Sequence, residues 1–550
     1  MNENADNIQN TGNVQRTILV CCETGCIANG SLEVAAALKQ RINKLGSDVH
    51  VETVVKQTGC IGFCGRGPLV RIMPDDISYY RVKAKDADDI IASLGGQPVE
   101  RLLYRKEDGT RVLSQKENPF YASQMKLALR NVGVLEAGDL EDFRAHGGYT
   151  ALAKALTMTP EEIISEVEKS GLRGRGGAGY LTGRKWRQAA ANENSPKYIS
   201  MNGDEGDPGA FMDRSMLEGD PHSVLEGIAI CALAVGAEQG ILYIRDEYPR
   251  ALEHMRKAVA DAEQAGILGD SLLGSNKVLH ITIVRGGGAF VCGESSAMIA
   301  SIEGGVGEPR GRYVHSTEEG LWGMPTVLNN VETFINVPLI INEGGEHYAS
   351  LGTEHSKGTK VFALVGQVKR SGLVEVPMGT TLREVIFDVG GGISGKHAFK
   401  AVHTGGPSGG CLPEQFLDVP VDFDSLVSHG SMMGSGGMVV MDETTCMVEA
   451  ARYNVQFLAR ECCGTCVPCR EGLRWLLDIL TGICEGRGAE ADLDLIEEIC
   501  ETLRLASRCA LGKTAENPVM STLRYFREEY RAHILEKRCP AGVCRMGVEP

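Results

Sequence analysis

The sequence predicts a multidomain protein of the α/β and α+β classes that ends in a helical domain. The chain has 550 residues, which is too many for one ordinary hydrophobic core. Strand and helix signals alternate near its N-terminal end, glycine-rich turns interrupt its middle, and helical periodicity dominates from about Asp442. These three patterns indicate four domains.

Residues 1–97 are predicted to form a small α/β domain. The stretches "TILVCC", "VHVETVV" and "LVRIM" are typical of strands, and "SLEVAAALKQRINKLG" is typical of an amphipathic helix that ends at a glycine. The polar residues 98–135 are expected to form a linker to the next domain.

Two cysteine pairs mark this first domain. The chain has 18 cysteines, and in a reducing compartment such a number indicates metal binding or redox chemistry. Cys21 and Cys26 follow a predicted strand, and Cys60 and Cys64 lie in the glycine-rich loop "TGCIGFCGRG", an arrangement that suits a [2Fe-2S] cluster. Cys22 is an alternative to Cys21, because only one of two neighbours on a strand points toward a given loop. A redox thiol pair would favour C-x-x-C spacing, which neither pair has.

Glycine is unusually dense in residues 136–350, the second predicted domain. The stretch "GLRGRGGAGYLTGRKW" matches G-x-G-x-x-G at Gly174, Gly176 and Gly179, a weak nucleotide-binding signal when taken alone. Nearby cations could face a phosphate together with backbone N–H groups. These cations are Arg173, Arg175 and Lys185.

An acidic turn, "MNGDEGDPGAF", follows in the same domain. Its polar residues are Asn202, Asp204, Glu205 and Asp207. Carboxylates do not suit a phosphate but can bind ribose hydroxyls and ring N–H groups. A calcium loop is the alternative, although the glutamate at the twelfth position of an EF-hand is missing.

The last two domains are predicted from a change of periodicity. Residues 351–440 contain strand-like stretches that indicate a compact sheet with one helix, and residues 441–535 show the apolar spacing of a small helical bundle. Residues 536–550 are expected to form a cysteine-containing tail.

The helical domain frames the densest cysteine run, "ECCGTCVPCREG". Cys463, Cys466 and Cys469 have the C-x2-C-x2-C spacing of a [4Fe-4S] site, and Cys509 is the predicted fourth ligand. Structural zinc is the rival, but zinc sites more often use two separated C-x2-C pairs. Cys462 falls outside the spacing and is predicted to be a spectator.

A final cysteine pair, Cys539 and Cys544, follows His533 closely. The pattern is equally consistent with a zinc site completed by another part of the chain or another subunit, and with two idle thiols in a tail. Four isolated cysteines are expected to be small buried core residues. They are Cys231, Cys292, Cys411 and Cys446.

Composition excludes several classes of function. A formal net charge of −16 argues against nucleic acid or an anionic membrane surface as the main partner. The longest apolar run, Ile228 to Val235, is far shorter than the ~20 residues of a membrane span, so no membrane insertion is expected. The first residues lack a signal-peptide pattern, and the expected location is cytoplasmic.

Taken together, the motifs resemble a known family. "GLRGRGGAG", "NGDEGDPGAF", "YIRDEYPRA", "GAFVCGE", "PTVLNNVET", "GGPSGGC" and "CGTCVPCREG" are similar to the NADH-binding flavin subunit of respiratory complex I and of soluble NAD-linked hydrogenases and formate dehydrogenases. The resemblance covers residues 120–535 and implies a Rossmann-like FMN and NAD(H) domain, an SLBB β-grasp domain and a helical [4Fe-4S] domain. Residues 1–97 resemble the thioredoxin-like [2Fe-2S] domain of a complex I partner subunit.

The resemblance also implies roles for individual residues. Those expected to contact FMN or the nucleotide are Gly174, Arg175, Gly176, Gly177, Tyr180, Lys185, Asn202, Asp204, Glu205, Tyr243, Glu247, Asn329 and Asn330. The catalytic centre is expected to include Lys185, Glu205 and Asp207. Tyr180 stands where the family usually has Phe, and Asp207 stands where it usually has Glu.

The implied activity is hydride exchange between NAD(H) and FMN, followed by one-electron transfer through iron–sulfur clusters. The fused N-terminal domain favours the flavin subunit of a soluble, NAD-dependent hydrogenase, including electron-bifurcating ones. Expected partners are an iron–sulfur relay subunit, a small [2Fe-2S] subunit and ferredoxin. The alternatives are the equivalent subunit of a formate dehydrogenase, a benzoyl-CoA reductase-type complex or complex I, and, in another class, a non-catalytic iron–sulfur scaffold.

Overall fold

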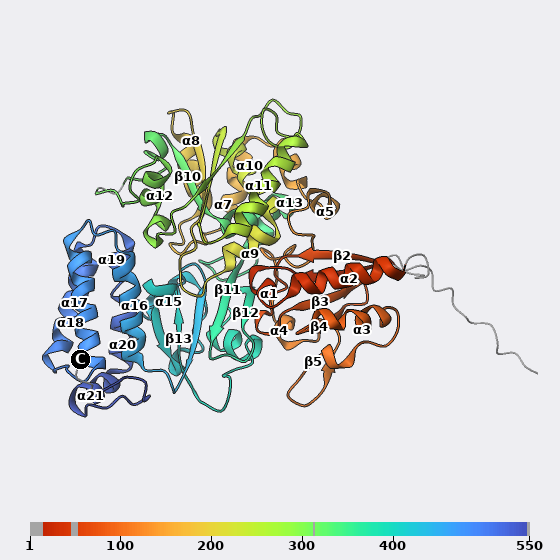
Figure 1. Ribbon diagram of the computed structural model, residues 1–550. Helices are drawn as coiled ribbons and strands as arrows, with labels where there is room; N and C mark the ends of the chain where they lie inside the picture. Colours follow the sequence, from red (N-terminus) through yellow and green to blue (C-terminus); the bar gives the residue numbers. More distant parts are fainter. Residues whose placement is uncertain (1–14, 46–52, 312–313, 547–550) are drawn as a thin grey trace, which may run out of the picture.

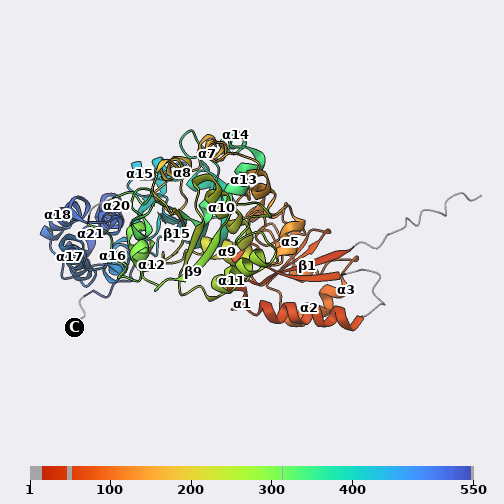
Figure 2. The same cartoon turned by 90° about the horizontal axis from the view of Figure 1, so that it is seen from above.

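The computed structural model describes residues 15–45, 53–311 and 314–546. Figures 1 and 2 show an elongated molecule with an N-terminal domain at one end and a helical domain at the other. Between them lie a domain built on a four-stranded parallel sheet (the parallel-sheet domain) and a domain built on a five-stranded sheet (the five-stranded domain).

The N-terminal domain contains a four-stranded sheet in the order β2-β1-β3-β4. Its strands are β1 (Arg16–Cys21), β2 (Thr53–Thr58), β3 (Leu69–Met73) and β4 (Ile77–Tyr80). Strand β1 pairs parallel with β2 and antiparallel with β3. Helix α2 (Ser31–Leu45) packs its apolar face on this sheet, and α1 (Thr24–Ile27) and α3 (Ala87–Ala92) complete the domain. The predicted strand "VHVETVV" lies partly outside the described residues.

The segment after this domain carries short elements. They are β5 (Tyr104–Arg105), β6 (Arg111–Val112) and α4 (Pro119–Ala122). Phe120 on α4 stacks on Phe63 of the N-terminal domain, with ring centroids 4.4 Å apart. The segment predicted as a polar linker therefore includes buried aromatic packing.

The parallel-sheet domain is built on four strands in the order β10-β7-β8-β9, all of them parallel. The strands are β7 (Tyr198–Gly203), β8 (Gln239–Ile244), β9 (His280–Arg285) and β10 (Thr326–Asn330). Its helices are α5 (Leu140–Ala145), α6 (Thr150–Ala155), α7 (Pro160–Lys169), α8 (Thr182–Ala191), α9 (Met212–Gly219), α10 (Pro221–Val235), α11 (Pro249–Gln264), α12 (Ser295–Ile302), α13 (Val331–Glu343) and α14 (Gly345–Ala349).

Helices cover both faces of this parallel sheet, as its apolar strands require. Helix α10 is buried along nearly its whole length and packs with α13 in the largest core cluster. On the other face, Ile299 of α12 packs against Ile241 of β8. The two layers leave the carboxyl ends of the strands as the open edge of the domain.

The five-stranded domain has the strand order β12-β11-β15-β13-β14. Its strands are β11 (Thr359–Gly366), β12 (Gly372–Pro377), β13 (Phe399–Thr404), β14 (Gly410–Pro413) and β15 (Gly437–Asp442). Helix α15 (Phe423–Ser428) and one π-helical segment (Glu384–Val389) lie against the sheet and share its core.

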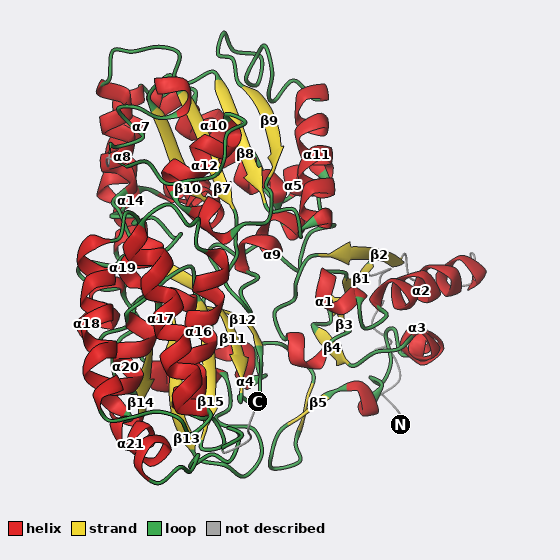
Figure 3. Ribbon diagram, turned by 60° about the vertical axis from the view of Figure 1, so that its left-hand side comes forward, coloured by secondary structure: helices red, strands yellow, loops and turns green. Residues whose placement is uncertain are grey.

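The helical domain packs its helices side by side, as Figure 3 shows. They are α16 (Met447–Glu461), α17 (Val467–Cys484), α18 (Ala491–Ala506), α19 (Ala510–Thr514), α20 (Asn517–Tyr525) and α21 (Arg527–Leu535). Leucine and isoleucine side chains on the facing sides form one core. None of the helices in the described ranges is long and apolar enough to cross a membrane.

Candidate functional site

Three residues predicted to bind a flavin or nucleotide lie side by side at the open edge of the parallel sheet. Asn202 of β7 is in register with Tyr243 of β8 on one side and with Asn330 of β10 on the other. Carboxyl ends of parallel strands are where open α/β sheets bind ligands. The sheet thus collects residues that are 128 positions apart in the sequence, from 202 to 330.

The glycine loop between α7 and α8 closes on itself above this edge. Gly174 N–H donates to the carbonyl of Tyr180 (2.8 Å), and Thr182 N–H donates to the carbonyl of Leu172 (2.9 Å). A Cβ on Gly176 would approach the Cβ of Asn330 to 3.1 Å, and Gly177 has a φ of +117°. The loop backbone therefore lies directly on the end of β10. A side chain at position 176 would crowd Asn330, and one at position 177 would strain the backbone.

Arg175 does not face this edge. Its side chain is fully buried and donates to the carbonyls of Arg173 and Lys357 and to the hydroxyl of Tyr348. Its backbone N–H donates to the hydroxyl of Thr333. In this structure the Arg175 side chain holds the loop in place, and its contact with a ligand stays a prediction.

Lys185 projects from α8 and donates to the carbonyl of Leu328 (2.7 Å). Burial lowers the pKa of Lys185 to about 8. An ammonium group has three donors, and within the described ranges no carboxylate forms an ion pair with it. A phosphate would satisfy the remaining donors and supply the missing negative charge, so the residues present fit a bound phosphate ester such as FMN.

Two carboxyl groups of the acidic turn face the same edge. Asp204 lies beside Arg245 at 3.5 Å, and its second carboxylate oxygen is buried without a hydrogen-bond partner in the described chain. Burial raises the pKa of Asp204 to about 7. Burial likewise raises the pKa of Asp207 to about 6, while Ser435 of the five-stranded domain donates to its carboxylate (2.7 Å). The unpartnered oxygen of Asp204 is the kind of atom that a ring N–H or ribose hydroxyl would satisfy.

The side chain of Glu205 points toward the start of α9. Its carboxylate accepts hydrogen bonds from the backbone N–H groups of Met212, Asp213 and Arg214 at the start of α9. Tyr248 also donates to it (3.1 Å). Most of these contacts are buried, and through them Glu205 caps α9 and fixes the acidic turn, while its catalytic role stays a prediction.

The other residues predicted to contact FMN or the nucleotide either lie at the open edge of the parallel sheet or hold neighbouring residues in place. Asn202 donates to the carbonyl of Gly293, and Asn330 donates to Asp213. Other supporting contacts are Trp186 to Asn329, Tyr180 to Gln188, Tyr243 with Ser301, and Arg245 to Glu247. Tyr180 lies under Lys185, with the ammonium 5.9 Å from the ring centroid.

The cysteine run lies in the loop between α16 and α17, close to the start of α19. Cys463 and Cys466 come from this loop, Cys469 lies in the first turn of α17, and Cys509 is the residue just before α19. Cys463, Cys466 and Cys509 pack against the same hydrophobic cluster as Cys469, and a Cβ on Gly512 of α19 would come within 3.1 Å of the Cβ of Cys469. The predicted fourth ligand is thus brought back across the bundle to the other three.

A hydrogen-bonded path joins the cysteine loop to the open edge of the parallel sheet, which is formed by Asn202, Tyr243 and Asn330 and is called the flavin-site edge below. Glu461, the last residue of α16, accepts a hydrogen bond from the backbone N–H of Phe290 (2.8 Å). The ring of Phe290 also packs on Phe457 of α16. Three residues after Phe290, the carbonyl of Gly293 accepts from Asn202 at the end of β7. One short loop therefore contacts both the flavin-site edge and the residue next to the cysteine run.

The N-terminal cysteine pairs also meet. The thiols of Cys60 and Cys64 are 3.7 Å apart. Hydrogen bonds from Cys26 and then Cys60 lower the pKa of Cys21 well below its usual value. A Cβ on Gly67 would come within 2.7 Å of the Cys26 sulfur, so only glycine allows this approach. Cys22 points elsewhere, and burial raises the pKa of its thiol to about 12.

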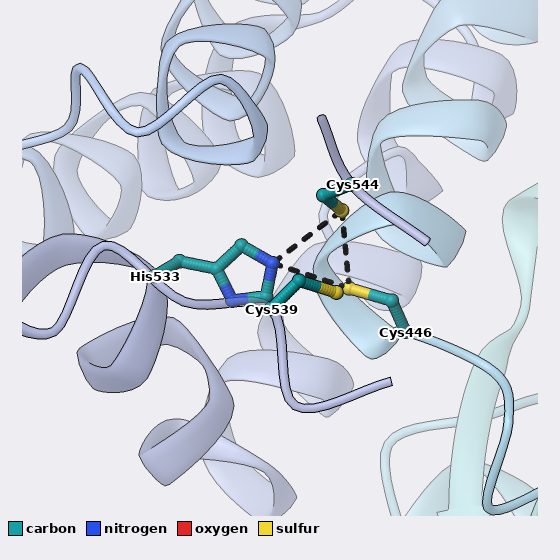
Figure 4. A group of neighbouring side chains, drawn as sticks. All are labelled: Cys446, His533, Cys539 and Cys544. Carbon is teal, nitrogen blue, oxygen red and sulfur yellow. Dashed lines mark hydrogen bonds between the residues drawn. The ribbon is translucent and has the colours of Figure 1, made fainter. Parts of the chain in front are cut away.

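The C-terminal cysteine pair meets His533 and an unexpected fourth residue. Figure 4 shows the side chains of Cys446, His533, Cys539 and Cys544 converging, and their ligand atoms lie within 4.8 Å of one another. His533 Nε2 is 3.5 Å from the Cys446 sulfur and 3.4 Å from the Cys544 sulfur, and the two sulfurs are 3.6 Å apart.

These separations match those of a tetrahedral zinc site. Zn–S bonds of about 2.3 Å place two sulfurs about 3.8 Å apart, and a Zn–N bond of about 2.0–2.1 Å gives an N to S separation of about 3.6 Å. His533 Nδ1 lies 2.7 Å from the carbonyl of Glu529, so it donates there and leaves Nε2 free to bind metal. Cys446, predicted to be a plain core residue, is instead part of this cluster, which corrects that prediction.

The chain matches four family models, one after another along the sequence. They are the thioredoxin-like [2Fe-2S] ferredoxin over residues 7–95, the Nuo51 FMN-binding domain over 167–339, the SLBB domain over 361–412, and the NADH-ubiquinone oxidoreductase-F iron-sulfur binding region over 449–533. The chain is 51% identical over 421 residues to the NADP-reducing hydrogenase subunit HndC of Solidesulfovibrio fructosivorans, a match that covers 76% of this chain and 86% of the relative. The chain belongs to this family of oxidoreductase flavin subunits.

Other members of this family extend the match. The F 2 subunit of NADH-quinone oxidoreductase from Rhizobium meliloti is 45% identical, over 75% of this chain and 98% of its own length. A crystal structure of an NAD+-reducing [NiFe]-hydrogenase in the H2-reduced state aligns with a TM-score of 0.66 and 28% identity, covering 94% of this chain and 84% of that chain. The predicted fold class and family resemblance are therefore confirmed, including the FMN-binding domain and the two iron–sulfur domains.

Proposed function

We propose that this chain exchanges hydride between NAD(H) and FMN at the open edge of the parallel sheet, and exchanges single electrons with partner subunits through its iron–sulfur clusters. The observation that carries the proposal is the loop from Phe290 to Gly293. It contacts Asn202 at the flavin site and Glu461 beside the cysteine run. A scaffold without nucleotide chemistry would not need this connection.

The chain's own residues bind and orient the cofactor in this proposal. The backbone of Gly176 lies against Asn330 of β10 and that of Gly177 lies against Gly434, and neither position has space for a side chain. Lys185 would hold the phosphate, and the unpartnered oxygen of Asp204 would accept a hydrogen bond from the ring or the ribose. Asp207, held by Ser435, would contact the nicotinamide nucleotide. Bound FMN supplies the chemistry that links a two-electron hydride carrier to one-electron clusters.

The ligands proposed for the [4Fe-4S] cluster are Cys463, Cys466, Cys469 and Cys509. Those proposed for the [2Fe-2S] cluster are Cys21, Cys26, Cys60 and Cys64. The close approach of Cys60 and Cys64 at 3.7 Å suits two thiolates on one tetrahedral metal. The N-terminal domain docks on α9, where Thr24 donates to Glu218 (2.7 Å). Because Glu205 caps the other end of α9, this helix fixes the second cluster domain relative to the acidic turn.

We further propose that Cys446, His533, Cys539 and Cys544 bind zinc. Their separations fit tetrahedral coordination, and the Glu529 carbonyl fixes the histidine tautomer. The metal would fasten the residues after α21 to the start of α16. This role is structural, because all four positions are taken by protein ligands.

A soluble NAD-linked hydrogenase is the complex we propose for this subunit. The identity to the NADP-reducing hydrogenase subunit HndC supports a hydrogenase, and the alignment with the NAD+-reducing hydrogenase over most of both chains supports NAD as its nucleotide. Partners would then include an iron–sulfur relay subunit and a small [2Fe-2S] subunit. Electron bifurcation is tested in the purified native complex by asking whether NAD+ and ferredoxin are reduced only together, and independent reduction would exclude it.

Anaerobic titration of the FMN-loaded chain with NADH tests the core proposal. The expected result is bleaching of the flavin absorbance, followed by the spectral signature of reduced clusters. Replacing Lys185 by Met should reduce FMN retention, and replacing Arg184, its exposed neighbour, by Met serves as the matched control. A fully FMN-loaded chain whose flavin is not reduced by NADH would refute hydride exchange.

A further inference from the structure

A fifth thiol lies against the proposed [4Fe-4S] ligands. Cys462 directly follows α16, and its sulfur is 3.3 Å from the sulfur of Cys469. The backbone N–H of Gly464 donates to the Cys462 sulfur (3.4 Å). One hydrogen bond therefore already fixes the position of this sulfur, and its own proton is free to point toward Cys469.

The direction of the Cys462–Cys469 contact follows from cluster chemistry. In the metal-free chain either sulfur can donate. A cysteine that binds iron must do so as a thiolate and has no proton left to give. With Cys469 bound to iron, Cys462 is the only donor in the pair, and its S–H group points at a negatively charged ligand.

The charged side chains near the cysteine loop are hydrogen-bonded elsewhere, so Cys462 is left as the side-chain donor to the Cys469 sulfur. The Arg470 side chain donates to the Gly464 carbonyl and pairs with Glu471, and the Glu461 carboxylate is taken by the backbone of Phe290. Cys463 lies 3.4 Å from the Thr465 hydroxyl. Each of these two ligand sulfurs, on Cys463 and Cys469, thus has its own side-chain partner.

We propose that Cys462 is a tuning residue, not a ligand, and that its S–H to sulfur hydrogen bond to Cys469 raises the reduction potential of the [4Fe-4S] cluster. Adding an electron increases the negative charge on the cluster sulfurs, so a hydrogen bond to one of them stabilises the reduced state more than the oxidised state. Hydrogen bonds to cluster sulfurs are among the factors that set such potentials. The proposal rests on the ligand set of the proposed function.

The consequence is a more favourable transfer of electrons from the flavin site to the cluster. Cys462 follows Glu461, which is bonded to the loop that also contacts the flavin-site edge. The proposed tuning residue therefore directly follows the residue that is bonded to this loop. The sequence spacing alone had indicated a spectator.

Redox titration of two variants tests the proposal. Cys462→Ala removes the donor, and Cys462→Ser keeps a hydroxyl donor on a shorter side chain. In the full chain loaded with FMN and clusters, the midpoint potential of the [4Fe-4S] signal is followed by electron paramagnetic resonance against chemical mediators. The [2Fe-2S] signal of the same sample is the internal reference. Iron and labile sulfide are counted in parallel, with Cys463→Ala as the control that loses a ligand.

The expected result is a full cluster complement in both Cys462 variants, a more negative [4Fe-4S] midpoint in Cys462→Ala, and a smaller shift in Cys462→Ser. The [2Fe-2S] midpoint should stay in place. An unchanged [4Fe-4S] midpoint in Cys462→Ala overturns the tuning role. Loss of the cluster in Cys462→Ala with retention in Cys463→Ala overturns it as well, because Cys462 would then be the ligand. Since mediators set the potential, these outcomes are independent of whether NADH reduces the flavin.

Discussion

Replacing Cys446 by Ala should remove zinc from the chain and loosen the helical domain. Cys446 and Cys544 are 98 residues apart in sequence, and their sulfurs are 3.6 Å apart. A cross-link that closes a loop of this length lowers the entropy of the unfolded chain by an amount equivalent to at most about 4–5 kcal/mol. Because a metal can also bind thiols in the unfolded chain, we expect a net loss of about 2–4 kcal/mol.

The assay combines metal analysis with thermal unfolding of the full, cluster-loaded chain under anaerobic conditions. Wild-type chain should contain one zinc, and the Cys446→Ala variant none. A loss of that size lowers the melting temperature of a domain of roughly 100 residues by about 8 °C or more. A zinc chelator should lower the wild-type melting temperature and leave the variant unchanged.

Cys500→Ala is the matched control. Cys500 is as buried as Cys446, at 1% and 2% exposed, and lies in the core of the same domain outside the four-residue cluster. It should keep its zinc and lose only the packing of one sulfur. If Cys446→Ala retains one zinc, or melts at the same temperature as Cys500→Ala, the coordination argued from the distances is wrong.

Three further changes test the flavin site and the relay. Because burial lowers the pKa of Lys185 to about 8, the charged side chain destabilises the flavin-free fold. Lys185→Met should therefore raise the melting temperature of the flavin-free chain and weaken FMN binding at least about tenfold in a fluorescence titration. A lower melting temperature of the flavin-free variant would contradict this. Burial raises the pKa of Asp207 to about 6, so the folded chain keeps a proton that the unfolded chain releases above about pH 4, and the free energy of unfolding should fall by about 1–2 kcal/mol as the pH rises from 4 to 6. Asp207→Asn should reduce the fall in urea unfolding curves by about this amount and leave the share of other buried carboxyls such as Asp204, and an unchanged pH profile would show that Asp207 does not titrate there. Cys466→Ser should spare the reduction of the flavin by NADH but slow the transfer of electrons beyond it in stopped-flow absorbance, and survival of both steps would remove Cys466 from the ligand set.

Local motifs account for what the sequence predicted well. The spacing of Cys463, Cys466 and Cys469 keeps three thiols near the loop before α17, because so short a run cannot separate them far. Glycine clusters and alternating elements likewise indicate an α/β ligand site, since both are properties of short stretches. The order of the four matched family models along the chain agrees with these local signals.

Side-chain direction is what the motifs left open. Arg175 lies in the glycine loop as predicted, yet its guanidinium points inward to Tyr348 and two carbonyls. Glu205 lies in the acidic turn but caps α9. A motif places a residue in a loop, and the packing around that loop decides which way the side chain points.

By itself, the sequence determined the family, the order of the domains and the loops that carry glycine, carboxylate and cysteine residues. Only the tertiary structure decided which distant residues meet. Cys446 joins His533 across 87 residues, and Ser435 reaches Asp207 across 228. Local spacing is encoded in short segments, whereas these encounters are set by the burial of apolar helix and strand faces far along the chain.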